Sequence, residues 1–130
     1  MQKLKELNRI KEAAYLIIIH LIENNFLNEA RFASSFARGK HRIKSWGKVR
    51  IINELKARHI SKYNIDLALK EISEEQYTAT FYKTATLSWN TIKETNIQKK
   101  RKKFCDYMLR KGYESNLIYT VLKELEDSII

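Results

Sequence analysis

The sequence contains no proline, only three glycines and a single cysteine in 130 residues. Without proline, the chain lacks the residue that interrupts helices most strongly. Cys105 has no second thiol to bond with, so an internal disulfide and a two-cysteine redox motif are both excluded. The glycines lie outside any GxxxxGK pattern, which excludes a phosphate-binding loop of the ATPase type.

Long hydrophobic runs are absent as well. The longest apolar stretch is AAYLIIIHL, which His20 interrupts, whereas a membrane-spanning helix needs about 20 apolar residues. The start of the chain alternates charges with leucine, unlike a secretory signal. Together with the lone cysteine, these features predict a cytoplasmic protein that does not insert into a membrane.

The apolar residues that are present follow the period of a helix. Hydrophobic residues make up 44% of the chain, and a chain of this size buries about two thirds of the surface that it exposes when unfolded. Ala14, Ile17, Ile18 and Leu21 recur at steps of three and four residues, which is the spacing of one helix face. Because no strand-like alternation competes, the sequence predicts an all-α fold.

Capping residues predict where the helices begin and end. A short helix near the start is expected to loosen at Asn8 and Arg9 before a longer one follows. Gly39 and Gly112 each offer a left-handed exit from a helix. The expected N-caps, in chain order, are Asn28, Ser45, Ser61 or Asn64, Ser73, Thr95 or Asn96, and Ser115 or Asn116.

The sequence also repeats internally. A shift of 53 positions places Ile51 on Phe104 and Leu55 on Met108, and a shift of 51 places Leu4 on Leu55. Apolar residues fall on apolar residues, which predicts units of about fifty residues with three helices each. Because each small unit buries apolar surface against its neighbour, we expect tandem three-helix repeats in an elongated, curved array.

This register divides the chain into three parts. Residues 1–25 are predicted to form the end of a first repeat, with its second and third helices, so that the first repeat is incomplete. Residues 26–72 are predicted to form a complete second repeat, and residues 73–130 a third.

Positive charge dominates the sequence, since 25 Lys and Arg against 15 Asp and Glu give a net charge of +10. No acidic residue lies between Glu29 and Glu54, and a second basic run begins at Lys99. A solvated helix face is the plain interpretation of such runs, but two clusters at similar places in two repeats favour a surface for polyanions. The candidate contact residues are Arg31, Arg38, Lys40, Arg42, Lys44, Trp46, Lys48 and Arg50 in the leading cluster, and Lys99, Lys100, Arg101, Lys102 and Lys103 in the secondary one. For Trp46, packing at the start of a helix is the alternative to contact with a partner.

No catalytic or metal-binding constellation is present in the pattern. His20, His41 and His59 are scattered, and none has the partner four residues away that a metal-binding helix requires. Cys105 takes the place of Ile52 in the repeat, which predicts a buried small hydrophobic residue. We therefore expect neither enzymatic activity nor a metal or other cofactor.

Three segments together resemble the RecX family of bacterial recombinase regulators: FLNEARFASSFARGK, WGKVRIINELKARHI and IDLALKEI. The residues that carry the resemblance are Phe26, Leu27, Asn28, Glu29, Arg31, Phe32, Ala33, Gly47, Arg50, Ile51, Glu54 and Leu55. LRKGYESNLIYTVLKEL is similar to the last repeat of the family. The chain departs from the family at His59, where the family has a glycine like Gly112, and the family carries a further segment before the equivalent of Gln2.

The resemblance implies a non-enzymatic regulator that lies in the groove of the RecA filament on DNA. It implies restraint of RecA ATP hydrolysis, strand exchange and co-protease activity, and hence a role in DNA repair, recombination and the SOS response. The implied partners are the RecA filament and, weakly and without sequence preference, single- and double-stranded DNA. We expect the protein to act as a monomer.

A free-standing DNA-binding module is the alternative from another class. In that case residues 46–56 would enter the major groove with helix-turn-helix geometry. Tight, sequence-selective duplex binding without RecA would favour this alternative, whereas weak and salt-sensitive binding favours the filament regulator.

Overall fold

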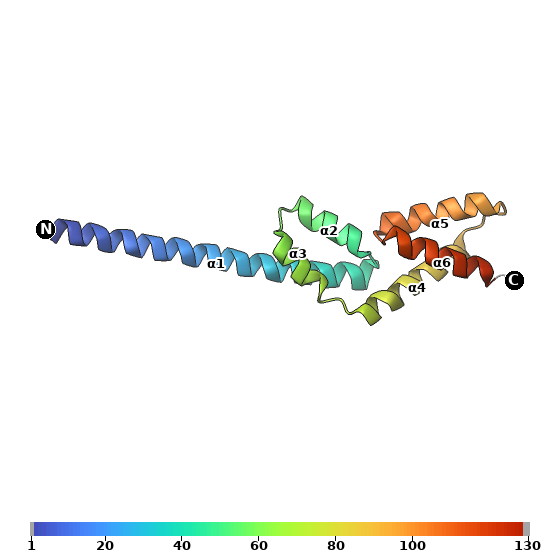
Figure 1. Cartoon of the computed structure of the whole chain (residues 1–130), viewed down its shortest axis with the longest axis horizontal. Helices are drawn as coiled ribbons and strands as arrows, with labels where there is room; N and C mark the ends of the chain where they lie inside the picture. The colour runs from blue at the N-terminus through green and yellow to red at the C-terminus, as the bar shows by residue number, and fades with distance from the viewer. Residues whose placement is uncertain (1, 129–130) are drawn as a thin grey trace.

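Helix α1 takes up the first third of the chain and extends along more than half of the molecule's long axis, and five shorter helices follow it (Figure 1). The computed structural model describes residues 2–128, and in that range it contains helices but no strand. The helices are α1 (Gln2–Lys44), α2 (Lys48–Ala57), α3 (Lys62–Leu69), α4 (Glu74–Thr91), α5 (Ile97–Lys111) and α6 (Ser115–Asp127). The predicted all-α, elongated architecture is confirmed.

The continuity of α1 corrects several predictions. It is one helix of 43 residues, whereas the sequence suggested breaks at Asn8, Asn28 and Gly39. Tertiary packing explains the continuity at Gly39, because the last turns of α1 lie against α2 and α3 and bury Ala33 and Ala37 completely. A glycine inside a helix costs about 1 kcal/mol relative to alanine, and this packing offsets that cost.

Gly39 provides a direct test of this explanation. It lies inside α1, and a Cβ atom added there would have nothing within 4 Å. We expect Gly39→Ala to raise the free energy of unfolding by about 0.5–1 kcal/mol, since alanine favours the helix and restricts the unfolded chain. Urea unfolding followed by circular dichroism measures the change, and a loss of stability would show that α1 needs a flexible point there.

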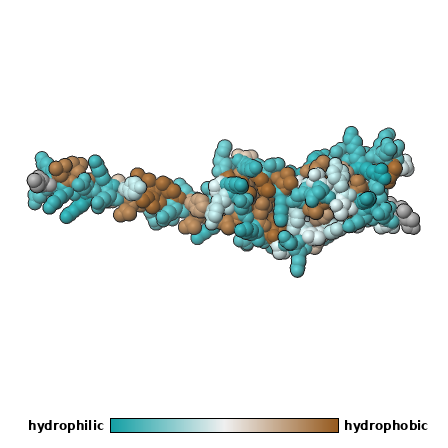
Figure 2. All heavy atoms as spheres, in the orientation of Figure 1, coloured by the Kyte–Doolittle hydropathy of each residue, from teal (hydrophilic) through white to brown (hydrophobic). Residues whose placement is uncertain are grey.

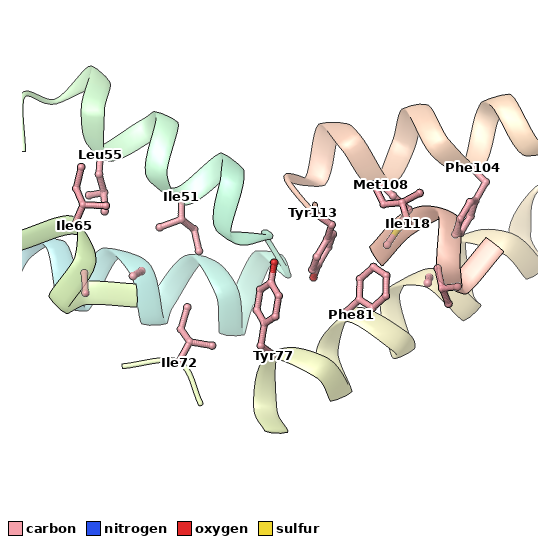
Figure 3. Close-up of a cluster of buried hydrophobic side chains, with 14 of the residues drawn as sticks. Ile51, Leu55, Ile65, Ile72, Tyr77, Phe81, Phe104, Met108, Tyr113 and Ile118 are labelled. Atoms are coloured by element: carbon pink, nitrogen blue, oxygen red, sulfur yellow. The ribbon is translucent and has the colours of Figure 1, made fainter. Parts of the chain in front are cut away.

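Two three-helix units follow one another along the chain. We call the end of α1 with α2 and α3 the middle repeat, and α4, α5 and α6 the last repeat. Positions that the sequence superposes are buried alike: Ile51 and Phe104 are fully buried, and so are Leu55 and Met108 (Figure 3). The tandem register is confirmed, while the exact boundaries between the repeats stay a prediction.

The turns inside the two repeats also correspond. His59 and Gly112 superpose in the sequence, and both have positive φ angles, of 60° and 95°. His59 thus takes the left-handed position that the family pattern gives to glycine. Ser61, Ser73 and Asn96 cap their helices as predicted, but the predicted cap Ser45 does not. α2 begins after Gly47 instead, with no side-chain cap.

The first part of α1 projects from the rest of the molecule (Figure 1). One unbroken helix replaces the two that were expected before residue 25, and Met1 lies outside the described residues. Figure 2 shows apolar residues on this projecting stretch. The large hydrophobic side chains exposed there are Leu4, Leu7, Ile10, Tyr15, Leu16, Ile17, Ile18, Leu21, Ile22, Phe26 and Leu27. An apolar surface of this extent is typical of a contact region.

Candidate nucleic-acid interface

Two glycine-containing turns hold the middle repeat against the last repeat. The backbone N–H of Gly47 donates to the carbonyl of Lys111 at 2.7 Å, and that of Val49 donates to the carbonyl of Gly112 at 2.9 Å. A Cβ on Gly47 would overlap the carbonyl of Gly112, and a Cβ on Gly112 would overlap Arg50. The two backbones are therefore in direct contact, and this contact fixes how the repeats are joined.

Buried polar side chains form hydrogen bonds across the same junction. The Tyr113 hydroxyl donates to the carbonyl of Ser45 at 2.6 Å, and the Tyr77 hydroxyl donates to the Glu114 carboxylate at 2.9 Å. The Tyr77 oxygen also accepts from the backbone N–H of Lys48. Figure 3 shows both tyrosines lying between the two groups of core residues. His41 is buried as well, stacked on the Tyr77 ring with 5.3 Å between ring centroids.

The junction tyrosines make stability sensitive to alkaline pH. Burial raises the pKa of Tyr113 to about 12, and burial next to Glu114 raises the pKa of Tyr77 as well. The folded protein therefore keeps protons that a tyrosine of the unfolded chain loses near pH 10. We expect the free energy of unfolding to fall as pH rises from about 10 to 12. Urea unfolding at several pH values checks this, and a pH-independent free energy in that window would contradict it.

The junction brings basic residues of both repeats together, and two of them contact Trp46. The Arg50 guanidinium lies 4.0 Å from the centre of the Trp46 ring, and the Lys40 ammonium lies 5.0 Å from it. Arg50 also donates to the backbone carbonyl of Arg110 at 3.1 Å, which places the Arg50 guanidinium against the last turn of α5. We call this set the junction cluster; its members are Lys40, Lys44, Trp46, Arg50, Arg110 and Lys111.

Positive charge in the junction cluster is concentrated without a counter-charge. None of its five cations forms an ion pair with a residue of the 2–128 range. The Lys111 ammonium donates to the carbonyl of Lys44 at 2.8 Å. Burial lowers the pKa of Lys111, and the nearby charges of Arg50 and Lys44 lower it further. An anion bound at this place would relieve that repulsion.

A second group of candidates lies along α1. Arg31, Arg38 and Arg42 are spaced by seven and four residues, so they share one face of the helix. All three are exposed, and none makes an ion pair with the residues that the structure describes. We call them the arginine ridge. They extend the positive surface away from the junction along the middle repeat.

Lys48 does not belong to either group. Its ammonium lies 4.6 Å from the centre of the Tyr77 ring, and it lines a depression together with Glu74 and Glu114. Residues two apart on a helix point in different directions, so Lys48 and Arg50 face opposite surroundings. The leading cluster is therefore divided, with Lys48 facing carboxylates.

The secondary cluster on α5 is partly neutralised. Arg101 pairs with Glu126, and Lys103 pairs with Glu94 at 3.2 Å. The Lys100 ammonium lies 4.1 Å from the centre of the Trp89 ring. Lys99 and Lys102 are exposed and form no ion pair within residues 2–128. Five consecutive basic residues thus spread around α5 instead of forming one patch.

The sequence of this chain is similar to known proteins over most of its length. Residues 28–69 match the model of the RecX second three-helix domain. A regulatory protein RecX of Clostridium acetobutylicum is 31% identical over 127 residues, which cover 95% of this chain and 58% of that protein. Over most of its length, this chain is similar to RecX proteins.

A second RecX protein is similar to this chain to the same degree. The regulatory protein RecX of Lactococcus lactis subsp. cremoris is 32% identical over 108 residues, which cover 82% of this chain and 40% of that protein. The chain thus spans about half the length of the RecX proteins that it matches. No solved structure gives a significant match.

The sequence analysis did not predict two members of the junction cluster as contact residues, Arg110 and Lys111. They occupy the last turn of α5, directly before Gly112. A glycine that ends a helix does signal a turn, but its contact with Gly47 joins positions far apart in the sequence. No local spacing predicts that contact.

The Trp46 ring both packs against another aromatic ring and contacts two cations. Its ring meets Phe36 edge to face, with 6.1 Å between centroids, and it is half-buried. The alternative DNA-binding module would need Trp46 and Arg50 to enter a major groove. In the structure both are engaged at the junction, where Arg50 would touch any side chain placed at Gly112.

Within the described residues there is no group of three or more His, Cys, Asp or Glu side chains placed to hold a metal ion. Cys105 is half-buried against the core, and burial raises the pKa of its thiol. In the same part of the chain, no helix has the length and apolar character needed to span a membrane.

Proposed function

We propose that this chain binds the RecA filament on DNA and lowers the ATPase, recombinase and co-protease activities of RecA. The protein acts in the cytoplasm without enzymatic activity of its own, in DNA repair, recombination and the SOS response. The observation that carries the proposal is the junction cluster: two of its cations lie against the Trp46 ring, and none of its five cations forms an ion pair with a residue of the 2–128 range. The relatives are named regulatory proteins.

The shape and chemistry of the molecule support this proposal. An elongated array of repeats offers a long surface for contact along a filament groove. Lysines and arginines neutralise phosphates, and an aromatic ring beside a guanidinium can stack on an unpaired base. The arginine ridge and the junction cluster together provide eight cations for such contacts.

DNA contact through these cations predicts weak, sequence-blind binding that depends steeply on salt. Each phosphate contact contributes a slope of about −0.7 on single strands or −0.9 on duplexes in a plot of log affinity against log salt. We expect a total slope of about −3 or steeper for the free chain on labelled oligonucleotides of unrelated sequence. Fluorescence anisotropy measures it.

Binding to the assembled filament tests the proposal itself. RecA filaments on single-stranded DNA should carry the chain down on sedimentation, and should do so more strongly than RecA alone or DNA alone. Strong binding to one duplex sequence without RecA would instead support the free-standing DNA-binding module. No enrichment in the filament pellet would contradict the proposed function.

A further inference from the structure

A groove of about 670 Å³ lies between α4 and α5, beside the turn that contains Ser45. Hydroxyl groups of α4 line one wall, since Thr84, Ser88 and Thr91 recur at steps of three and four residues. Leu87, Ile92 and Tyr107 supply apolar surface. Leu87 is 57% exposed, so its side chain is available to a ligand.

Charge is distributed unevenly along this groove. The lining cations are Lys103, Arg110 and Lys111, and the lining acid is Asp106. Lys103 already pairs with Glu94. Arg110 and Lys111 have no ion pair within residues 2–128 and adjoin the rest of the junction cluster. The end of the groove at the junction therefore favours negative charge, while its interior favours apolar side chains.

We infer that the α4–α5 groove binds a short acidic segment of a protein partner, with apolar side chains that contact Leu87 and Tyr107. Charge complementarity selects the acidic residues, since Arg110 and Lys111 can pair with carboxylates at the groove end. The aliphatic surface of Leu87 and Ile92 suits leucine or phenylalanine better than a phosphate backbone. This inference goes beyond the proposed function, because a peptide can bind in the groove whether or not the junction cluster contacts DNA.

Fluorescence anisotropy with three labelled peptides tests the inference on the full chain. The first probe is Ser-Glu-Asp-Leu-Phe-Asp-Glu-Leu-Glu. The second replaces its leucines and phenylalanine by serine, and the third replaces its acids by the corresponding amides. We expect the first to bind at least about tenfold more tightly than either of the others, because both burial and charge contribute.

Two variants locate the binding on the protein. Leu87→Ser and Arg110→Gln should each weaken binding of the first peptide by about tenfold. Leu109→Ser, on α5 and outside the groove lining, and Lys123→Gln, on α6, are the matched controls and should bind normally. Circular dichroism verifies that each variant is folded.

Several outcomes would overturn the groove proposal. The first is that the first peptide does not bind. The second is that the second peptide, which keeps the acids but lacks the leucines and phenylalanine, binds equally well. The third is that Leu87→Ser binds the first peptide as tightly as the unchanged chain does. Oligothymidylate could also displace the first peptide from the unchanged chain and from Leu87→Ser equally well. That result would assign the site to nucleic acid. Filament sedimentation of the Leu87→Ser variant separates the two proposals, because Leu87 lies outside the junction cluster and filament binding should persist.

Discussion

Replacing Gly112 by alanine is expected to lower the free energy of unfolding by about 3 kcal/mol or more. Gly112 has a φ of 95°, and a left-handed backbone costs about 1–2 kcal/mol for a residue with a Cβ. The new Cβ would also overlap Arg50, and such overpacking costs about 1–3 kcal/mol. Urea unfolding followed by circular dichroism measures the sum.

Gly47→Ala separates the cost of steric overlap from the cost of a left-handed backbone. Gly47 has a φ of −77°, which any residue adopts, so only the overlap with the Gly112 carbonyl remains. This variant should be destabilised less than Gly112→Ala, while Gly39→Ala serves as the control without overlap. If Gly112→Ala cost less than about 1 kcal/mol, the contact between the two turns would not be what joins the repeats.

Reversing three charges in the leading cluster is expected to weaken binding to the RecA filament by about a hundredfold, which corresponds to about 2.7 kcal/mol. The variant carries Lys40→Glu, Arg42→Glu and Lys44→Glu. It removes two cations of the junction cluster and one of the arginine ridge, and it puts negative charge beside DNA phosphates. Anisotropy of labelled filaments measures the affinity.

A matched control isolates position from total charge. Lys3→Glu, Lys5→Glu and Arg9→Glu make the same change in net charge on the exposed, projecting end of α1. The control should bind within a few-fold of the unchanged chain, since long-range charge is screened beyond about 10 Å. Equal losses in both variants would show that net charge, not the leading cluster, determines binding.

The sequence predicts the repeat register because that register follows from the local spacing of apolar residues. Ile51 and Phe104 are equivalent in sequence and equally buried. Ser61 and Ser73 cap their helices by accepting hydrogen bonds from backbone N–H groups three residues further along the chain. The continuity of α1 could not be predicted in this way. Gly39 predicts a helix end, but glycine inside a helix costs only about 1 kcal/mol, and packing between helices outweighs that cost.

The candidate site was predictable as a set of residues but not as a surface. Acid-free windows identify basic residues, yet the partners that neutralise Arg101 and Lys103 come from other helices. Lys48 and Arg50 are close in sequence, but only Arg50 faces Trp46. Arg110 joins the site because two distant turns meet. Tertiary contact decides each of these cases.

ATP hydrolysis by RecA on single-stranded DNA, measured with and without this chain, is the most direct test of the filament proposal. Hydrolysis should fall as the chain is added, and the variant with glutamate at positions 40, 42 and 44 should leave it unchanged. Undiminished hydrolysis at saturating chain, or equal inhibition by the triple variant, would contradict a role for the cations at the junction in regulating RecA.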